Sequence, residues 1–500
     1  MSRAIVIGGG ITGLATAALL ARDGHQVTLL EKQPAVGGRA GVWERDGFRF
    51  DTGPSWYLMP EVFDHFFKLL GTSAAEQLEL VRLDPGYRVL FEDGEPITVT
   101  SDRAENLALF EGIEPGAGSR LDRYLDSAGD TYEMAKKRFL YSTFASFRPL
   151  LRRDVLTRLP TLASLLLQSL HGRVAATVSE PRLQQILGYP AVFLGSSPYT
   201  TPSMYHLMSH LDLTDGVYYP LGGFTRVIER IAALATDAGV SLRTSAPVRR
   251  ILVENGVAVG VECEDGSVLP ADIVVSTADL HHSETALLDK QHQTYPEKYW
   301  RRRVAGPGAL LLYLGIRGEL PQLEHHTLLF AKDWRANFEA IFGADPRVPD
   351  VASLYVCKPS GVDPDVAPPG HSNVFVLVPI PADPALDDLD ALGDRVIEQL
   401  SVWAEIPDLA ERVVVRRAVG PADFARELNS WKGSSLGPAH ILKQSAFFRG
   451  SNRSRKVRGL YYAGSSSAPG IGLPMCLISA ELVIKRLRGD VSTTPLTEPL

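Results

Sequence analysis

The sequence has few cysteines, no long hydrophobic run and no excess of positive charge. Only three of its 500 residues are cysteines, and the spacings of Cys263, Cys357 and Cys476 match neither a zinc ligand pair nor a redox pair. No apolar run reaches the roughly 18 residues that a membrane-spanning helix needs. The formal net charge is -7 without a long run of one sign, which argues against nucleic acid as a partner. These absences favour a cytoplasmic globular protein of two or three lobes.

The N-terminal residues 3–31 have the pattern of strand, glycine turn, helix and second strand. Gly8, Gly10 and Gly13 fill the spacing G-x-G-x-x-G, and Glu31 stands at the end of the second strand. In this motif the glycines allow a tight turn, close approach of a pyrophosphate and close packing of helix on strand. The acid accepts hydrogen bonds from ribose hydroxyls. The pattern therefore predicts a dinucleotide site.

A second glycine cluster follows the acid. The stretch "QPAVGGRAGVWERDGFRFDTGPSWY" places Gly37, Gly38 and Arg39 directly after the second strand. The first motif alone does not separate FAD from NAD. No second G-x-G-x-x-G follows a strand elsewhere, which argues against a separate nicotinamide domain.

Both ends of the chain resemble one group of flavoproteins. The N-terminal motif with "GGRAGVWERDGFRFDTGPS" resembles the superfamily that contains amine oxidases, Rab escort-type proteins and carotenoid desaturases. Near the C-terminus, "QSAFFRGSNRS" and "NRSRKVRGLYYAGSSSAPGIGLPMCLIS" resemble the signature of the bacterial-type phytoene desaturase family of FAD-dependent oxidoreductases. The similarity extends through "FLGSSPYTTPSMYHLMSHLDLTDGVYYPLGGF" and "VVSTADLHH", so it covers most of the chain.

The resemblance implies an α/β fold. Its Rossmann-type FAD-binding domain, of the glutathione-reductase/amine-oxidase-like superfamily, is expected from residues 1–104, 216–300 and 436–500. Alternating apolar runs between 301 and 435 predict a substrate domain built on a mainly antiparallel sheet. The mostly helical pattern of residues 105–215 predicts a helical membrane and substrate lobe. Within 216–300, turns are expected at Asn255-Gly256 and Asp265-Gly266.

The cofactor that the resemblance implies is non-covalent FAD. Val248 would meet the adenine through its backbone, Gly464 would approach the ribityl or pyrophosphate portion, and Leu473 would lie near the flavin at the start of a helix. A helix N-terminus there would stabilise negative charge on the reduced flavin. The expected cofactor-binding residues are Gly8, Gly10, Gly13, Glu31, Lys32, Gly38, Arg39, Gly53, Pro54, Ser55, Val248, Gly464, Ser465, Leu473, Pro474 and Met475.

Other candidate site residues are not assigned to catalysis or metal binding. His206 and His210 are four apart, a spacing that can bind zinc, but the glutamate of H-E-x-x-H is absent and a packed helix is favoured. His281 and His282 are expected near a helix start. Cys476 is expected as a small buried residue rather than a covalent flavin link. No catalytic acid or base is fixed by spacing, and no metal site is predicted.

The function that the resemblance implies is desaturation of a linear carotenoid such as phytoene, towards lycopene. Hydride would pass to the flavin and then to oxygen or a quinone. The alternatives are a carotenoid isomerase, terminal oxidase or C30 desaturase, a flavin amine oxidase, and an isoprenoid escort protein without flavin chemistry. The intact glycine motif and Glu31 argue against an escort protein.

A basic, leucine-rich segment around residues 136–173 bears on membrane attachment. Its basic residues include Lys136, Lys137, Arg138, Arg148, Arg152, Arg153 and Arg158. They stand beside Leu162, Leu165, Leu166 and Leu170. Such a segment suits either an anionic bilayer surface or a core helix with a solvated basic side. A forty-carbon polyene leaving lipid for water would cost roughly 30 kcal/mol, so peripheral attachment to the membrane is expected.

Overall fold

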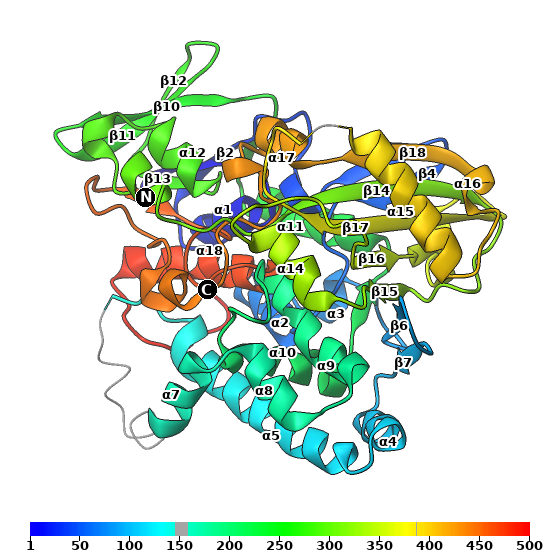
Figure 1. The fold of residues 1–500 in the computed structure, drawn as a ribbon. Helices are drawn as coiled ribbons and strands as arrows, with labels where there is room; N and C mark the ends of the chain where they lie inside the picture. Colours follow the sequence, from blue (N-terminus) through cyan, green and yellow to red (C-terminus); the bar gives the residue numbers. More distant parts are fainter. Residues whose placement is uncertain (146–158, 387) are drawn as a thin grey trace.

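The computed structural model describes residues 1–145, 159–386 and 388–500. One sheet of five parallel strands has the order β19-β13-β1-β2-β9. It unites strands from the N-terminus, the middle and the C-terminus of the chain, as the predicted FAD-binding domain requires (Figure 1). Its strands are β1 (Arg3–Ile7), β2 (Gln26–Leu30), β9 (Ser241–Arg243), β13 (Ile273–Ser276) and β19 (Leu460–Tyr462).

Three long helices pack beside the parallel sheet. Helix α1 (Ile11–Arg22) contacts both α11 (Gly223–Asp237) and α18 (Leu473–Arg488). In α1 every residue from Ile11 to Leu20 is buried. Its alanines and its glycine leave short side chains on all faces, so neighbouring elements can approach its backbone closely.

The second large sheet has seven strands in the order β18-β14-β17-β16-β15-β6-β7. All pairs are antiparallel except β15 with β6, which confirms the predicted mainly antiparallel sheet. Helices α15 (Leu389–Trp403) and α16 (Leu409–Arg412) lie along its outer face (Figure 1). The strands are β6 (Tyr87–Phe91), β7 (Ile97–Val99), β14 (Gly308–Arg317), β15 (His326–Phe330), β16 (Leu354–Cys357), β17 (His371–Ile380) and β18 (Val413–Val419).

Strands β6 and β7 lie within residues 1–104, which the sequence analysis places in the FAD-binding domain. They are hydrogen-bonded instead to the edge of the seven-stranded sheet. Strand β6 pairs in parallel with β15, and this pairing joins segments more than 230 residues apart. No local sequence pattern reveals such a contact. The predicted division into domains remains a prediction.

The described residues between 103 and 215 form the helical lobe at the bottom of Figure 1. Arg148, Arg152, Arg153 and Arg158 of the predicted membrane segment lie outside the described residues. The lobe contains α4 (Arg103–Ile113), α5 (Ala117–Ala135), η2 (Lys136–Leu140), α7 (Leu159–Leu167), α8 (Leu170–Thr177), α9 (Pro181–Gly188), η4 (Tyr189–Leu194), η5 (Ser203–Leu207), α10 (Met208–His210) and η6 (Leu211–Asp215).

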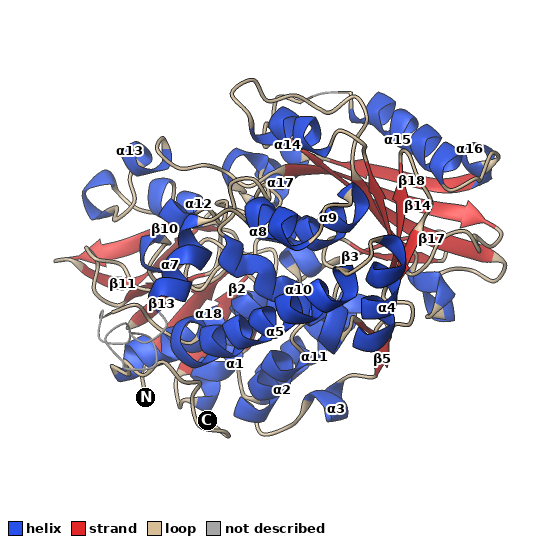
Figure 2. Ribbon diagram, turned by 60° about the horizontal axis from the view of Figure 1, so that its bottom comes forward, coloured by secondary structure: helices blue, strands red, loops and turns tan. Residues whose placement is uncertain are grey.

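A three-stranded antiparallel unit formed by β10 (Val248–Glu254), β11 (Val257–Cys263) and β12 (Val268–Pro270) contacts strand β13 of the parallel sheet. Its first turn has positive φ at Asn255 and Gly256, as a tight hairpin requires. Connecting elements include α2 (Pro60–Leu69), β8 (Tyr218–Pro220), α12 (Leu280–Thr285), α14 (Trp334–Phe342), α17 (Pro421–Leu428), η11 (Leu442–Gln444) and η12 (Ala446–Phe448). Figure 2 shows helices such as α5, α8 and α10 in front, with the strands β14, β17 and β18 of the large sheet on the right and β2, β11 and β13 on the left.

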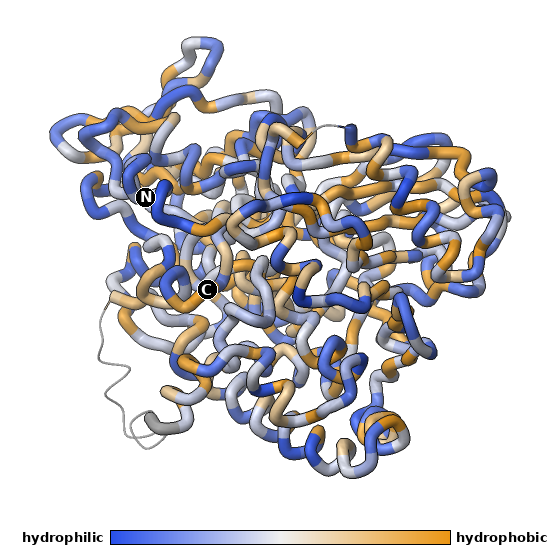
Figure 3. The backbone as a smooth tube through the Cα atoms, viewed as in Figure 1, coloured by the Kyte–Doolittle hydropathy of each residue, from blue (hydrophilic) through white to orange (hydrophobic). Residues whose placement is uncertain are grey.

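Hydrophobic residues concentrate along the strands of the seven-stranded sheet, and hydrophilic residues mark the outer turns (Figure 3). Within the described part of the chain, no helix combines the length and the apolar character needed to cross a bilayer. The strands of the large sheet alternate between two buried faces. One packs under α15, and the other faces a cavity.

Candidate functional site

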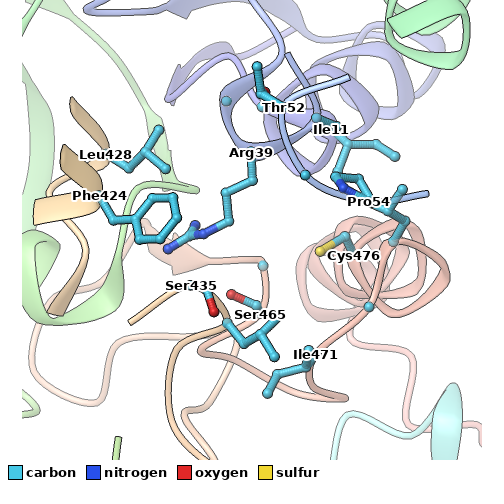
Figure 4. A pocket seen from close by; sticks show the side chains of 18 of the residues that line it. Ile11, Arg39, Thr52, Pro54, Phe424, Leu428, Ser435, Ser465, Ile471 and Cys476 are labelled. Atoms are coloured by element: carbon cyan, nitrogen blue, oxygen red, sulfur yellow. The ribbon is translucent and has the colours of Figure 1, made fainter. Parts of the chain in front are cut away.

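A cavity of about 1050 Å³ lies between the parallel sheet, the seven-stranded sheet and the helical lobe. Every predicted cofactor-binding residue except Gly13 lines it. The two ends of the chain therefore meet in one space, as Figure 4 shows for Ile11 and Arg39 facing Ser465 and Cys476. The volume is at the upper end of the range for small-molecule sites.

The glycines of the first motif are required by their neighbours. A Cβ on Gly13 would lie 1.8 Å from the carbonyl oxygen of Gly8, so only glycine lets α1 pack on this turn. Gly8 has φ +100°, a conformation that side-chain-bearing residues rarely adopt. A Cβ on Gly53 would lie 2.6 Å from the carbonyl oxygen of Arg39. Gly13 thus shapes the site from behind its wall.

Two helices begin at the cavity without a side-chain cap. Gly10 is the N-cap of α1 and Gly472 is the N-cap of α18, and neither offers a side chain to the first N–H groups. Leu473, Pro474 and Met475 form the first turn of α18 at the cavity wall. Uncapped N–H groups and the helix dipole favour a negatively charged ligand at both places.

The Glu31 carboxylate is buried at the end of β2 and fixes the glycine turn. Its Oε2 accepts a hydrogen bond from the N–H of Gly9 at 2.6 Å, and its Oε1 accepts one from the N–H of Gln33 at 2.7 Å. Each oxygen keeps a further lone pair, and the residue lines the cavity. Glu31 therefore holds the turn as well as presenting acceptors to a ligand.

Arg39 extends its guanidinium into the cavity between Phe424 and Ser465 (Figure 4). One terminal nitrogen donates to Ser430 Oγ at 2.9 Å, while the buried Nε has no hydrogen-bond partner. Burial lowers the pKa of Arg39, against the opposing charge of Asp279. A half-buried cation with a free, buried donor is suited to an anionic ligand.

Two other predicted residues have protein partners of their own. The Lys32 ammonium donates to the carbonyl of Arg426 and to Asn429 Oδ1, each at 3.1 Å. Ser55 Oγ is hydrogen-bonded to the Tyr355 hydroxyl at 2.7 Å. Both residues line the cavity while also joining its two halves.

Much of the remaining wall of the cavity is apolar, with Asn337, Arg417 and His440 among its polar members, and the sequence alone did not single these residues out. Alternate residues of β14 and β15 face it, and they are joined by side chains from α14, α17 and η4. The period-2 pattern of these strands predicts a sheet, but it does not show which face of the sheet lines the cavity. This wall includes Val192, Phe193, Leu311, Tyr313, Leu328, Phe330, Trp334, Phe338, Ile341, Leu377, Phe424 and Leu428.

An aromatic wall formed by Trp56, Tyr189, Phe193 and Tyr355 bounds this apolar part. Trp56 contacts the rings of the other three, with centroids between 5.3 and 6.1 Å away. Buried polar groups behind the wall hold its hydroxyls: Tyr189 donates to Asp212 Oδ2 at 2.7 Å, and the Tyr355 hydroxyl bonds His326 Nδ1 at 2.7 Å. The hydroxyl anchors fix the rings and leave their apolar surfaces to the cavity.

Asp212 itself predicts a pH-dependent stability. Burial raises its pKa to about 7, although hydrogen bonds from Tyr189 and Tyr87 act in the opposite direction. The folded chain then holds a proton that the unfolded chain, with a pKa near 3.9, has lost, so this contribution to stability falls as the pH rises from about 4 to 7. Asp212→Asn keeps the acceptor oxygen and removes the titration. Between about pH 5 and 8, the free energy of unfolding of the variant should therefore rise relative to that of the parent by roughly 2 to 3 kcal/mol.

Denaturant unfolding of both proteins across that pH range checks this expectation. If the free energies of unfolding of the parent and the variant differ by the same amount at every pH, Asp212 is ionised throughout this range. Glu254→Gln, at an exposed site on β10, serves as the matched control with no such trend.

The histidines set aside at the sequence level have other partners. His206 is buried and hydrogen-bonded to Ser127 Oγ at 3.1 Å and to the carbonyl of Met204 at 3.3 Å, and burial lowers its pKa to about 4. His281 lies in the first turn of α12, as expected, with Nε2 2.7 Å from a Glu297 oxygen. Cys476 is buried in α18 at the cavity wall, and burial raises its pKa.

Comparison with known proteins places this site in a family. Residues 11–484 match the family described as flavin containing amine oxidoreductase. The chain belongs to this family. It is 43% identical to the carotenoid 3,4-desaturase of Haloarcula japonica, with 97% of this chain and 98% of that protein covered. It is 35% identical to the ζ-carotene-forming phytoene desaturase of Myxococcus xanthus, with 97% and 93% covered. The 4,4'-diapolycopene oxygenase of a Methylomonas species is 31% identical over 98% of each chain.

Solved structures share the fold. An oxidoreductase from Methanosarcina mazei superposes with a TM-score of 0.63 at 18% identity, with 97% of this chain and all of that chain covered. Wild-type putrescine oxidase bound to putrescine gives a TM-score of 0.64 at 14% identity, with 98% and 99% covered. The predicted fold class is confirmed. The chain is a flavin oxidoreductase of the carotenoid desaturase kind.

Proposed function

We propose that this protein is an FAD-dependent desaturase that introduces double bonds into a linear carotenoid. The observation that carries the proposal is one cavity whose lining combines a glycine-rich part suited to anions with a part rich in apolar side chains. The first part suits a dinucleotide and the second suits a hydrocarbon. A flavin amine oxidase would use a compact polar entrance, whereas this apolar end is lined by aliphatic and aromatic side chains.

The residues present fit FAD. The uncapped starts of α1 and α18, the unpaired Nε of Arg39 and the close glycine packing all provide for a large anionic ligand. Gly8, Gly10 and Arg39 would lie along the pyrophosphate, Glu31 at the adenosine ribose and Val248 at the adenine. Leu473, Pro474 and Met475 would lie beside the flavin ring, where the start of α18 favours negative charge by on the order of 1 kcal/mol.

Bound FAD would supply the redox chemistry by accepting a hydride from a carbon next to the conjugated chain. The protein's own residues bind and orient the hydrocarbon. Leu311 projects from β14, and Leu328 and Phe330 project from β15 of the same sheet, and together they exclude water from it. The aromatic wall restricts sideways movement, since its hydroxyls are tied to groups behind it. Delocalisation over the polyene lowers the demand for a catalytic base.

The position of the new double bond has two candidates. The 43% identity with a carotenoid 3,4-desaturase favours a bond near the end of an already conjugated chain. The 35% identity with a phytoene desaturase supports the second candidate, in which the substrate is phytoene and desaturation proceeds towards lycopene. Oxygen or a quinone would accept the electrons in either case.

We also propose that the protein attaches peripherally to a membrane, because its substrate would not leave lipid unaided. Apolar side chains are exposed near the basic segment: Leu167 at the end of α7 is 80% exposed and Phe448 in η12 is 60% exposed. The neighbouring Phe447 contacts Phe144, with ring centroids 4.7 Å apart. Leu167 and Phe448 would insert among lipid headgroups.

The test is an assay in liposomes. Flavin-loaded protein is incubated separately with phytoene and with lycopene, and the products are separated by chromatography and identified by mass and absorption spectra. Loss of two hydrogens per step with a longer chromophore supports desaturation. Products that gain oxygen would assign terminal oxidation, and no conversion of either substrate by an FAD-replete protein would remove the proposal.

The apolar end predicts a variant that separates substrate binding from cofactor binding. Leu328→Gln keeps the side-chain length but places an amide against the hydrocarbon, where an unpaired polar group costs about 1 to 3 kcal/mol. Carotenoid turnover, measured as kcat/KM, should fall roughly tenfold to a hundredfold. FAD affinity should change less than about twofold, because Leu328 lies on β15, away from both glycine motifs. Equal losses of FAD affinity and turnover would mean that the cavity is not divided in this way.

A further inference from the structure

Three buried side chains next to the aromatic wall bring metal-binding atoms together. Candidate ligand atoms of His325, His326 and Cys357 all lie within 4.8 Å of one another. The residues are 6%, 0% and 1% exposed. The strand register explains the cluster, because His326 of β15 stands directly opposite Cys357 of β16. The sequence analysis predicts no metal site, and the spacing of cysteines alone could not have revealed this one.

Three of the four imidazole nitrogens of this cluster lack a hydrogen-bond partner within the described residues. Both ring nitrogens of His325 and the Nε2 of His326 are buried and unpartnered. Buried polar side-chain atoms in native proteins are nearly always satisfied, so three such nitrogens in one place indicate a ligand. The His326 Nδ1 is 2.7 Å from the Tyr355 hydroxyl, which is 2.7 Å from Ser55 Oγ. If Nδ1 donates, Nε2 presents a lone pair, as in metal-bound histidines held by an outer hydrogen bond.

The charges around the cluster favour a cation. Asp363 is a buried carboxylate and Asp51 is a half-buried one. Their hydrogen bonds come from backbone N–H groups and hydroxyls, and within the described residues neither forms a salt bridge, although the charge of Arg49 acts on Asp51. The negative charge of Asp51 acts on Cys357. Among the described residues, Lys358 carries an opposing charge that acts on His325, and its ammonium donates to the carbonyl of Leu320 at 2.7 Å.

We propose that His325, His326 and Cys357 bind one zinc ion. Imidazole and thiolate are ligands that Zn²⁺ prefers, and three protein ligands with one water complete a tetrahedral shell. On binding, the Cys357 thiol releases its proton to solvent, so the site adds one net positive charge beside the two carboxylates. No electron transfer is involved.

The ion would connect β15 to β16 and fix the aromatic wall. The His326 ring stacks on Trp56, with centroids 4.3 Å apart and planes 10° apart. Trp56 in turn bounds the cavity. Zinc is therefore a structural group that holds the ring of His326, and through it the position of Trp56. This inference does not depend on the identity of the substrate.

The first experiment measures metal content in the native chain. The protein is produced without a polyhistidine tag in medium that contains zinc, iron and copper, and the metals are quantified by mass spectrometry against protein concentration. About one zinc per chain is expected, retained after gel filtration. Less than about a tenth of an equivalent, both as isolated and after incubation with zinc sulfate, would overturn the proposal and assign the unpaired nitrogens to buried water.

Matched variants locate the zinc. Cys357→Ala and His325→Gln should each lower zinc content at least about tenfold. Cys263→Ala, another buried cysteine in the three-stranded unit, should leave it unchanged. Since a variant can fail to fold, X-ray absorption at the zinc edge of the unmodified protein gives an independent readout. It should show one sulfur near about 2.3 Å and nitrogens near about 2.0 to 2.1 Å.

Several outcomes contradict the assignment. Zinc that survives in folded Cys357→Ala, or a shell without sulfur, would place the ion elsewhere. Copper or iron in place of zinc would refute the choice of metal.

Discussion

Replacing Gly13 with alanine is expected to abolish FAD binding and to destabilise the FAD-binding half. The added Cβ would lie 1.8 Å from the Gly8 carbonyl oxygen and 2.9 Å from Thr277 Oγ1. Both are contacts with groups fixed by the parallel sheet, so α1 must move away from the turn. We expect a loss of roughly 3 kcal/mol or more in stability and a weakening of FAD affinity of at least about a hundredfold.

The matched control is Gly112→Ala. Gly112 also lies within a helix, α4, and nothing lies within 4 Å of a Cβ placed there. Alanine at this position should be neutral or stabilise the protein by about 0.5 to 1 kcal/mol. Thermal unfolding with and without FAD separates the two effects, because at a given concentration a ligand that binds the folded state more tightly raises the melting temperature more. If Gly13→Ala binds FAD as tightly as the parent does, the hypothesis that FAD binding requires close packing of α1 on the glycine turn is wrong.

The sequence predicted those parts of the fold whose causes are local. A strand, a glycine turn, a helix and Glu31 follow one another within about 30 residues, and the structure forms the same elements in the same order. The hairpin at Asn255-Gly256 depends on two adjacent residues and was also predicted. Alternation along β14 and β15 predicted strands, since period-2 patterns reflect a local geometry.

The parts that were not predicted depend on contacts between distant segments. Strand β6 joins the large sheet through β15, although their residues are more than 230 positions apart. Tyr189 is held in the aromatic wall by its hydrogen bond to Asp212. Arg39 lies beside α17 and donates a hydrogen bond to Ser430. The cluster of His325, His326 and Cys357 depends on strand register. Residue type and spacing do not encode such juxtapositions, which is why the candidate site could be named at its glycine-rich end and not at its apolar end.

Glu31→Ala is expected to weaken FAD affinity by more than about a hundredfold. Two causes add in the same direction. The carboxylate would no longer accept hydrogen bonds from the ribose, each charge-assisted bond being worth roughly 1.5 to 3 kcal/mol. The N–H groups of Gly9 and Gln33 would also lose their acceptor, which loosens the turn that faces the pyrophosphate.

Glu31→Gln separates the two causes. Its amide oxygen can replace one carboxylate oxygen, but its NH₂ group would face a second N–H, so an intermediate affinity is expected. FAD titration of the apoproteins, with Glu254→Ala as an exposed acidic control on β10, measures the series. Because the ribose would lie far from the reacting flavin ring, carotenoid turnover by both variants should recover largely when FAD is in excess, with the same products. An alanine variant that binds FAD like the parent would show that Glu31 only ends a strand, and turnover that stays low at saturating FAD would show that the loosened turn reaches the flavin itself.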